Sequence, residues 1–192
     1  MLVNMFGAPS SGKSTIAANV FARLKTDGIP AEFISERARE VIAKFKFKKI
    51  KTMSDEMQLE ILEAQYHAET YFKHSTDYPV IADSSTLLTL AYGTESFFQR
   101  YGDRVQQLVN NIVSEMDVVF YLPLRDSVQD DPNRIHNYEQ CLEVDSKIRN
   151  ILNTYLKNQP HIKIVELTGG IQEMTDKVLS ELENYNGRQV SR

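Results

Sequence analysis

Gly7-Ala8-Pro9-Ser10-Ser11-Gly12-Lys13-Ser14 is the stretch that decides the fold of this 192-residue chain, because it matches the phosphate-binding pattern G-x-x-x-x-G-K-[ST] at every fixed position. Its two glycines let the backbone curl so that successive N–H groups face an anion, and the helix that follows adds its positive N-terminal end. In such a loop the lysine reaches the β and γ phosphates of a nucleotide, and the serine hydroxyl binds Mg²⁺. The stretch and Thr15 behind it therefore predict a nucleotide-binding site.

The sequence on either side of the loop fits this prediction. Residues 1–6 are a short apolar run typical of a strand, and Ile16, Val20 and Leu24 recur at helical spacing until Gly28. Strand, loop and helix thus come in the order that the motif needs. The alternative, a chance glycine turn between a strand and a helix, gives no reason for the lysine and the serine.

The rest of the chain alternates strands with helices. Short apolar segments bounded by turn residues predict strands at 31–35, 80–82, 117–122 and 162–167. Helical spacing predicts helices at 37–43, from a cap at Thr52 or Ser54 to about 76, at 85–92, 95–115, 144–155 and 171–184. In the second of these helices the predicted apolar stripe is Met57, Ile61, Ala64, Ala68 and Phe72. The pattern is α/β, a P-loop NTPase three-layer sandwich with a five-stranded parallel sheet, helices on both faces, and the site at the strands' carboxyl ends.

Length and composition are those of a globular protein with 42% hydrophobic and 25% charged residues. We expect a single domain over residues 1–184 and a flexible tail over 185–192. The one cysteine, Cys141, cannot form an intramolecular disulfide, and the apolar N-terminus is too short for a signal peptide. No apolar run approaches the roughly 20 residues of a membrane span, so we expect a cytoplasmic protein without a membrane partner. The net charge of -4 argues against binding through whole-surface electrostatics but leaves local patches open.

Two acidic residues end predicted strands on the same edge of the sheet. Asp83 follows residues 80–82, where a phosphate-loop protein places its second Mg²⁺ contact, so Ser14 and Asp83 are the predicted metal ligands. The alternative role for Asp83 is the N-cap of the next helix. Glu36 follows residues 31–35 and is either catalytic or a solvated acid favoured by the helix dipole.

The polar loop at 123–137 carries Arg125 and Arg134 and is predicted to be a lid after the fourth strand. Phosphoryl transfer needs cations that meet the charge spreading over the transferred group, and both arginines can supply them when the lid closes. Arg134 is the preferred one of the pair. The alternative is that at least one of them is an incidental surface arginine.

A basic run at 44–51 holds five lysines with Phe45 and Phe47 between them. One interpretation is a solvated surface. A second is a flexible segment that follows a nucleic-acid backbone while bases stack on the rings. A third is a site for a small anionic substrate, for which the candidate residues are Glu36, Arg39, Lys46 and Lys48.

Several motifs up to about residue 155 carry a family resemblance. They are Met1-Leu2-Val3-Asn4 with the phosphate loop and Ser14-Thr15, Ala31-Glu32 leading to Glu36-x-Ala38-Arg39, Gln65, Asp83-Ser84-x-x-Leu87-Leu88, and Pro132-x-Arg134 followed by Asp145-x-x-Ile148. In these the chain resembles phage P-loop kinases that include the 5-hydroxymethyluridine DNA kinases, relatives of thymidylate kinase. The segment at 36–40 is more loosely similar to ribosylnicotinamide kinases.

The resemblance implies an ATP- and Mg²⁺-dependent kinase in the host cytoplasm that phosphorylates the 5-hydroxymethyl group of a modified pyrimidine in DNA. One alternative is a kinase acting on a nucleoside, a nucleotide or ribosylnicotinamide, and another is an NTP-driven switch or motor subunit. The two lid arginines favour a kinase over a switch. The chain departs from the family at Arg37, at Ser85 and in a lid without its usual glycine. These departures lie on the acceptor side, so the acceptor, the donor base, the general base (Glu36 or Asp83) and the oligomeric state stay open.

Overall fold

Five parallel strands form one sheet in the computed structural model, which describes residues 1–47, 53–124 and 137–190 and, within them, no side chains at 46–47 and 185–190. The strand order is β2-β3-β1-β4-β5. The strands are β1 (Leu2–Phe6), β2 (Glu32–Ile34), β3 (Val80–Ala82), β4 (Val118–Tyr121) and β5 (Lys163–Glu166). Pairing is parallel throughout, with Leu2 opposite Val80 and Val3 opposite Val118. The predicted five-stranded parallel sheet is confirmed.

Helices connect the strands in the predicted alternation. They are α1 (Lys13–Thr26), α2 (Arg37–Phe47), α3 (Asp55–Ser75), the 3₁₀ helix η1 (Thr86–Tyr92), α4 (Glu95–Glu115), α5 (Tyr138–Ile151), the π-helical turn η2 (Leu152–Leu156) and α6 (Ile171–Val190). Within the described part of the chain, none of these helices is long and apolar enough to cross a bilayer.

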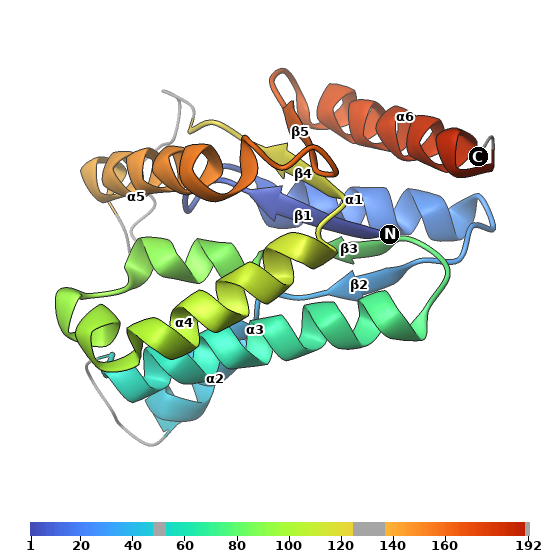
Figure 1. Ribbon diagram of the computed structural model, residues 1–192. Coiled ribbons are helices and arrows are strands. Elements are labelled where there is room, and N and C mark those ends of the chain that lie inside the picture. The colour runs from blue at the N-terminus through green and yellow to red at the C-terminus, as the bar shows by residue number, and fades with distance from the viewer. Residues whose placement is uncertain (48–52, 125–136, 191–192) are drawn as a thin grey trace.

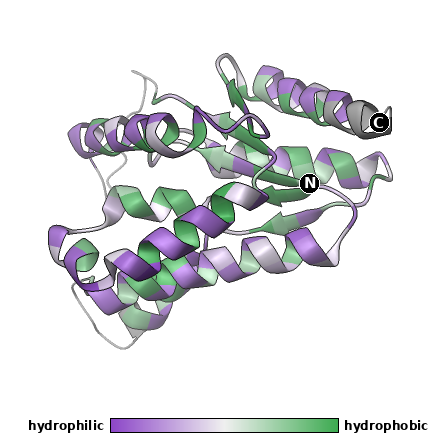
Figure 2. Ribbon diagram, in the orientation of Figure 1, coloured by the Kyte–Doolittle hydropathy of each residue, from purple (hydrophilic) through white to green (hydrophobic). Residues whose placement is uncertain are grey.

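The helices form two layers around the sheet (Figure 1). Alternate residues of β1 point to opposite faces, so Leu2 and Phe6 pack with α3, α4 and α5, while Val3 and Met5 pack with α1 and α6. The central strands are therefore mainly hydrophobic, whereas the helices mix hydrophobic and hydrophilic residues (Figure 2). The predicted three-layer sandwich follows from these two apolar cores.

The observed helices differ from the predicted ones in four places, one of which is that α5 begins at Tyr138 and not at residue 144. Helix α2 continues to Phe47 instead of ending at residue 43, so the first part of the basic run is helical. Its Lys44 Nζ lies 2.6 Å from Glu60 Oε1 of α3, so an exposed ion pair links the two helices. The segment after β3 forms a 3₁₀ helix, and α6 extends beyond residue 184. Of the two predicted caps, Ser54 accepts a hydrogen bond from the Met57 N–H, whereas Thr52 lies outside the described residues.

The buried side of α3 is more polar than predicted. Of the expected apolar stripe, Met57 and Ile61 are buried, but Ala64, Ala68 and Phe72 are only half-buried. The deepest line on the helix is instead formed by Gln58, Leu62, Gln65 and Glu69. These polar side chains can be buried because β1 and the segment after β3 provide hydrogen-bond partners for them.

Glu69 is fully buried and accepts hydrogen bonds from three neighbours. Asn4 Nδ2 lies 3.1 Å from Oε1, Gln65 Nε2 lies 3.0 Å from the same atom, and the Thr86 hydroxyl lies 2.8 Å from Oε2. The backbone N–H of Thr86 also donates to the carboxylate. Burial raises the pKa of Glu69 from 4.5 to about 7 despite these hydrogen bonds.

This raised pKa predicts a pH-dependent stability that Glu69→Gln removes. In the unfolded chain the carboxyl ionises near its ordinary pKa of 4.5, so its contribution to stability is full below that pH and is lost as the pH rises through about 7. The free energy of unfolding of the wild-type protein should therefore fall, relative to that of the variant, by up to about 1.4 kcal/mol per pH unit in this window. Urea unfolding of both proteins at several pH values checks this, and parallel curves would contradict it.

Candidate functional site

The phosphate loop is the turn between β1 and α1, and its backbone needs the residues that the motif provides. A Cβ on Gly7 would lie 2.5 Å from Ser11 Oγ and 2.6 Å from the carbonyl oxygen of Leu122. Ser10 and Gly12 adopt left-handed conformations with φ of 72° and 97°. The loop is therefore wound tightly enough that only glycine fits at position 7.

Helix α1 begins at Lys13 with its first N–H groups available to an anion. Its first turn holds no acidic residue, and the N-cap position is occupied by Gly12, which has no side chain to accept their hydrogen bonds. Lys13 Nζ turns back onto the loop and donates to the Ala8 carbonyl oxygen at 2.9 Å. Burial lowers the pKa of Lys13, and the nearby Glu36 and Asp83 carboxylates act against this shift. A bound phosphate would add to the counter-charge that these two carboxylates provide.

The crowding at Gly7 gives a test of the loop that does not depend on the reaction. Gly7→Ala should lower the free energy of unfolding by about 1–3 kcal/mol, because the new methyl group overpacks the loop. Gly102→Ala is the matched control, since a Cβ there meets nothing within 4 Å and the residue lies inside α4. That control should raise stability by about 0.5–1 kcal/mol. Chemical unfolding of both variants decides it, and equal effects would contradict the tight winding.

Asp83 follows β3 on the same edge of the sheet as the loop, and its side chain is 5% exposed. It is not the cap of the next helix. Ser85 takes that place, because its hydroxyl accepts the hydrogen bond from the Leu87 N–H. The capping alternative for Asp83 is thereby removed.

The carboxylate of Asp83 is buried with an oxygen that lacks a partner among the described residues, namely Oδ1. Burial raises the pKa of Asp83, while a hydrogen bond from Ser14 and the charge of Lys13 act in the opposite direction. An orphaned carboxylate oxygen beside the loop serine fits a hard cation. The described residues contain no cluster of three His, Cys, Asp or Glu side chains for a metal, so an ion here would take most of its ligands from phosphate and water, as Mg²⁺ commonly does.

Arg39 joins the acidic residue after β2 to the phosphate loop. Its Nε donates to Glu36 Oε2 at 2.9 Å, and its Nη2 donates to Ser14 Oγ at 3.0 Å. The hydrogen bond from Glu36 raises the pKa of Arg39. A cation thus bridges the hydroxyl that would bind the metal and the carboxylate that we predicted on the acceptor side.

Five of the residues predicted for the site come together at the carboxyl ends of β1, β2 and β3: Lys13, Ser14, Glu36, Arg39 and Asp83. Thr15, the ninth predicted phosphate-loop residue, lies in the first turn of α1 with an exposed side chain. Arg125, Arg134 and Lys48 lie outside the described residues, as does the side chain of Lys46. Their predicted roles stay predictions.

Two residues near the site were not predicted from the sequence. Cys141 on α5 is 1% exposed and lies close enough to Lys13 to influence its pKa. Tyr92 ends η1, and partial burial raises the pKa of its hydroxyl, with smaller contributions from Glu36 and Cys141. Neither residue belongs to a motif, and each reaches the site only because α5 packs on η1 in the folded chain.

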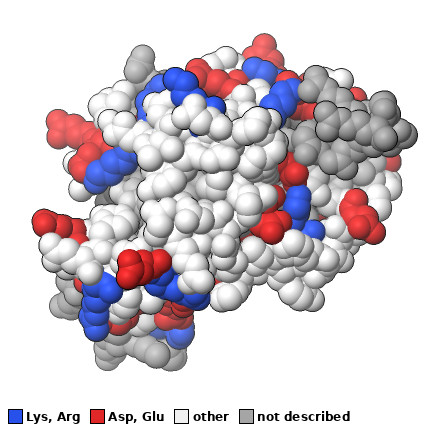
Figure 3. Space-filling model, viewed as in Figure 1, with Lys and Arg blue, Asp and Glu red and all other residues white. Residues whose placement is uncertain are grey.

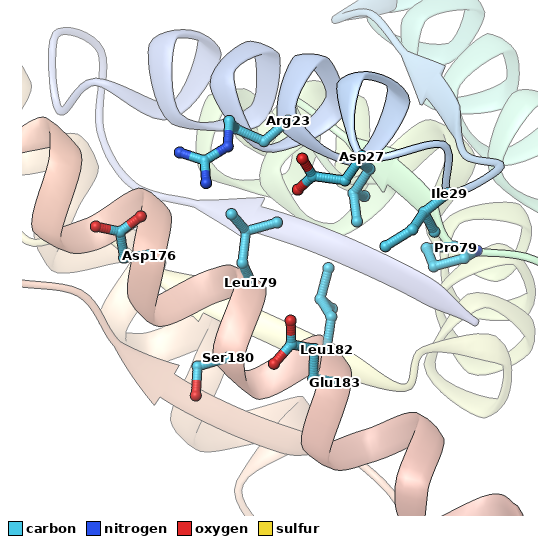
Figure 4. A pocket seen from close by; sticks show the side chains of 10 residues that line it. Arg23, Asp27, Ile29, Pro79, Asp176, Leu179, Ser180, Leu182 and Glu183 are labelled. Atoms are coloured by element: carbon cyan, nitrogen blue, oxygen red, sulfur yellow. The ribbon is translucent and has the colours of Figure 1, made fainter.

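A groove lies at the far end of α1, away from the phosphate loop (Figure 4). Arg23 of α1 and Asp27, which caps the end of that helix, line one side, and Asp176 and Glu183 line it from α6. Pro79, which precedes β3, closes one end. Because Pro79 lies at the amino end of its strand, this groove is separate from the residues described above.

Comparisons with known proteins agree with this architecture. A family model described as an AAA domain matches residues 2–173. No match was found among curated protein sequences. Among solved structures, a deoxyadenosine kinase from M. mycoides with bound dCTP is similar with a TM-score of 0.66 and 16% identity, over 96% of this chain and 100% of the other.

Two structures of NadR protein are also similar. The complex with NAD and AMP-PNP gives a TM-score of 0.68 and 19% identity, and the complex with NR gives 0.71 and 20%. Each covers 92% of this chain, which spans 48% and 50% of the respective NadR chains. At these identities the likeness is one of fold.

Proposed function

This chain belongs to the AAA domain family, whose model spans residues 2–173, and from this premise we propose that it is an ATP- and Mg²⁺-dependent kinase that phosphorylates a hydroxyl group. The observation that carries the proposal is a phosphate loop whose Lys13 and Ser14 lie beside the buried carboxylate of Asp83, one oxygen of which has no partner among the described residues. The similar fold of a deoxyadenosine kinase supports it.

The donor phosphates would be held by the loop. The free N–H groups at the start of α1 would bind them, and Lys13 would exchange its hydrogen bond to the Ala8 carbonyl for one to the γ phosphate. Ser14 and Asp83 would hold Mg²⁺, which when bound neutralises charge on the β and γ phosphate oxygens. For this, the Ser14 oxygen must be released by the Arg39 guanidinium that now donates to it.

On the acceptor side, Glu36 is the proposed general base. It would take the proton of the acceptor hydroxyl while that oxygen bonds to the γ phosphorus and the bond to the β–γ bridging oxygen breaks, leaving ADP. Release of Arg39 from Ser14 would free a guanidinium N–H beside the transferred group. Arg134, and with it Arg125, would meet the remaining charge from the lid.

The acceptor that we propose from the family resemblance is the 5-hydroxymethyl group of 5-hydroxymethyluridine in DNA, reached by base flipping or at a frayed strand. A free nucleoside or ribosylnicotinamide is the second candidate. It is favoured by the ion pair between Lys44 and Glu60, which occupies one lysine of the basic run. Charges of both signs also alternate along the edges of the face in Figure 3, and the described residues in that view form no continuous basic surface.

A transfer assay with γ-labelled ATP tests the proposal. The acceptors are duplex DNA with 5-hydroxymethyluracil, the same duplex with thymine, and a panel of nucleosides including deoxyadenosine and ribosylnicotinamide. Label on the modified duplex alone supports the DNA acceptor, and label on a free nucleoside supports the second candidate. Phosphate release without transfer to any acceptor would overturn the kinase in favour of an NTP-driven switch.

A further inference from the structure

Gln65 is 2% exposed, and both ends of its side-chain amide form hydrogen bonds with backbone groups next to Glu36 and Asp83. Its Oε1 accepts a hydrogen bond from the Arg37 N–H at 3.2 Å. Its Nε2 donates to the Ser84 carbonyl oxygen at 3.4 Å. Arg37 directly follows Glu36, and Ser84 directly follows Asp83. A single side chain therefore spans the two turns that present these carboxylates.

Backbone pairing alone does not hold these turns together. Strands β2 and β3 pair as far as Ile34 opposite Ala82, and the last link between them is the hydrogen bond from the Asp83 N–H to the Ile34 carbonyl at 3.0 Å. Beyond this hydrogen bond the two segments continue into different helices, β2 into α2 and β3 into η1. Gln65 makes the next described connection after the strand pairing ends.

The hydrogen-bond partners of Gln65 determine which end of its amide faces which turn. The Ser84 carbonyl can only accept a hydrogen bond and the Arg37 N–H can only donate one, so the Gln65 Nε2 faces Ser84, and this nitrogen also donates to Glu69 Oε1 at 3.0 Å. Asn4 and Thr86 hold the Glu69 carboxylate in turn. The Gln65 oxygen is thereby directed to the Arg37 N–H, since the other orientation would place two acceptors against each other.

We infer that Gln65 is a positioning residue, which sets the distance between Glu36 and Asp83 and so between the acceptor hydroxyl and the bound phosphate. The inference rests on the proposed kinase function. Transfer is sensitive to such spacing, because a displacement of about 1 Å between reacting groups can lower a rate about 10²-fold. Nucleotide binding, by contrast, depends on the loop, which Gln65 does not contact.

The chain offers a matched control on the same helix. Gln58 is 4% exposed, lies two helical turns before Gln65, and donates its Nε2 to the Thr89 carbonyl at 2.8 Å. It thus ties α3 to η1 but does not reach Arg37 or Ser84. Gln65→Met and Gln58→Met remove the same amide at similar volume and should cost similar stability.

The decisive experiment compares kcat and KM for ATP in the two variants. Gln65→Met should lower kcat about 30-fold or more with KM for ATP within about twofold of wild type, and Gln58→Met should leave kcat within about threefold. Equal losses of kcat in both variants, at equal stability, would reduce Gln65 to a structural residue and overturn the inference. A double variant, Gln65→Glu with Glu69→Gln, keeps an amide and a carboxylate in contact. It therefore tests the inference if Gln65→Met fails to fold.

In that double variant position 65 retains an acceptor for the Arg37 N–H but has no donor for the Ser84 carbonyl. We expect a folded protein with lowered kcat and unchanged KM for ATP, and wild-type kcat would count against the inference. A wild-type protein without transfer would instead refute the proposed function. Hydrogen exchange separates the two failures, because the Arg37 amide should exchange at least about tenfold faster in Gln65→Met than in Gln58→Met whatever the reaction is.

Discussion

Lys13→Ala should reduce phosphoryl transfer by about 10²–10³-fold or more, because it deletes the point charge that meets the γ phosphate. The fold should survive. Lys13 is a desolvated cation whose pKa is lowered by burial, so its removal relieves an unfavourable burial instead of opening a cavity. Steady-state transfer and chemical unfolding, measured on the same preparation, check both halves of the expectation.

Lys25→Ala is the matched control, since Lys25 lies in the last turn of the same helix and its Nζ contacts only the Phe21 ring in the described contacts, at 5.9 Å. That variant should keep wild-type transfer. If Lys13→Ala retains turnover with ATP and Mg²⁺, the phosphate-loop interpretation of residues 7–14 is wrong.

Asp83→Asn should produce the second large effect, a loss of about 10²-fold or more in transfer at limiting Mg²⁺. Burial raises the pKa of this carboxyl, so its ionised form costs stability at neutral pH, and that cost sets in as the pH rises above the ordinary pKa of 3.8. The neutral amide removes the cost. We therefore expect an unfolding temperature equal to or above that of the wild-type protein, measured in the absence of nucleotide.

Ser85→Ala is expected to give the opposite result. Ser85 caps η1 two residues after Asp83, and its loss should lower stability by about 1 kcal/mol while the Mg²⁺ dependence of transfer stays unchanged. Titration of activity with Mg²⁺ for the two variants separates a metal ligand from a structural residue. Wild-type activity of Asp83→Asn at limiting Mg²⁺ would exclude Asp83 as a ligand.

The fold could be predicted from the sequence because its signals are local. The phosphate-loop motif requires a strand before it and a helix after it, and short apolar segments such as residues 80–82 indicate the other buried strands. Alternation of strands and helices then leaves a parallel sheet as the economical arrangement. The same locality placed Lys13, Ser14, Glu36 and Asp83 at one edge of the sheet before their contacts were known.

The contacts that were missed depend on residues far apart in the chain. Arg39 reaches Ser14 only because α2 returns over the loop, and the polar line of Gln58, Gln65 and Glu69 is buried only because β1 and η1 supply partners for it. Its spacing on α3 is helical and aligned with Leu62, which was a usable signal, but the residue types alone do not indicate burial. Whether such a residue is buried depends on its partners in the folded chain, which cannot be identified from the sequence.

Because Cys141 is buried, the labelling rate of the chain's single thiol can measure local opening of the protein near the site. A labelling reagent can reach the buried sulfur only when the protein around α5 opens, so the labelling rate reports how often that opening occurs. Because Cys141 lies close enough to Lys13 to influence its pKa, nucleotide bound at the phosphate loop should slow labelling. The chain has no second cysteine that could compete for the reagent, so the labelling rate reports the opening around Cys141 alone.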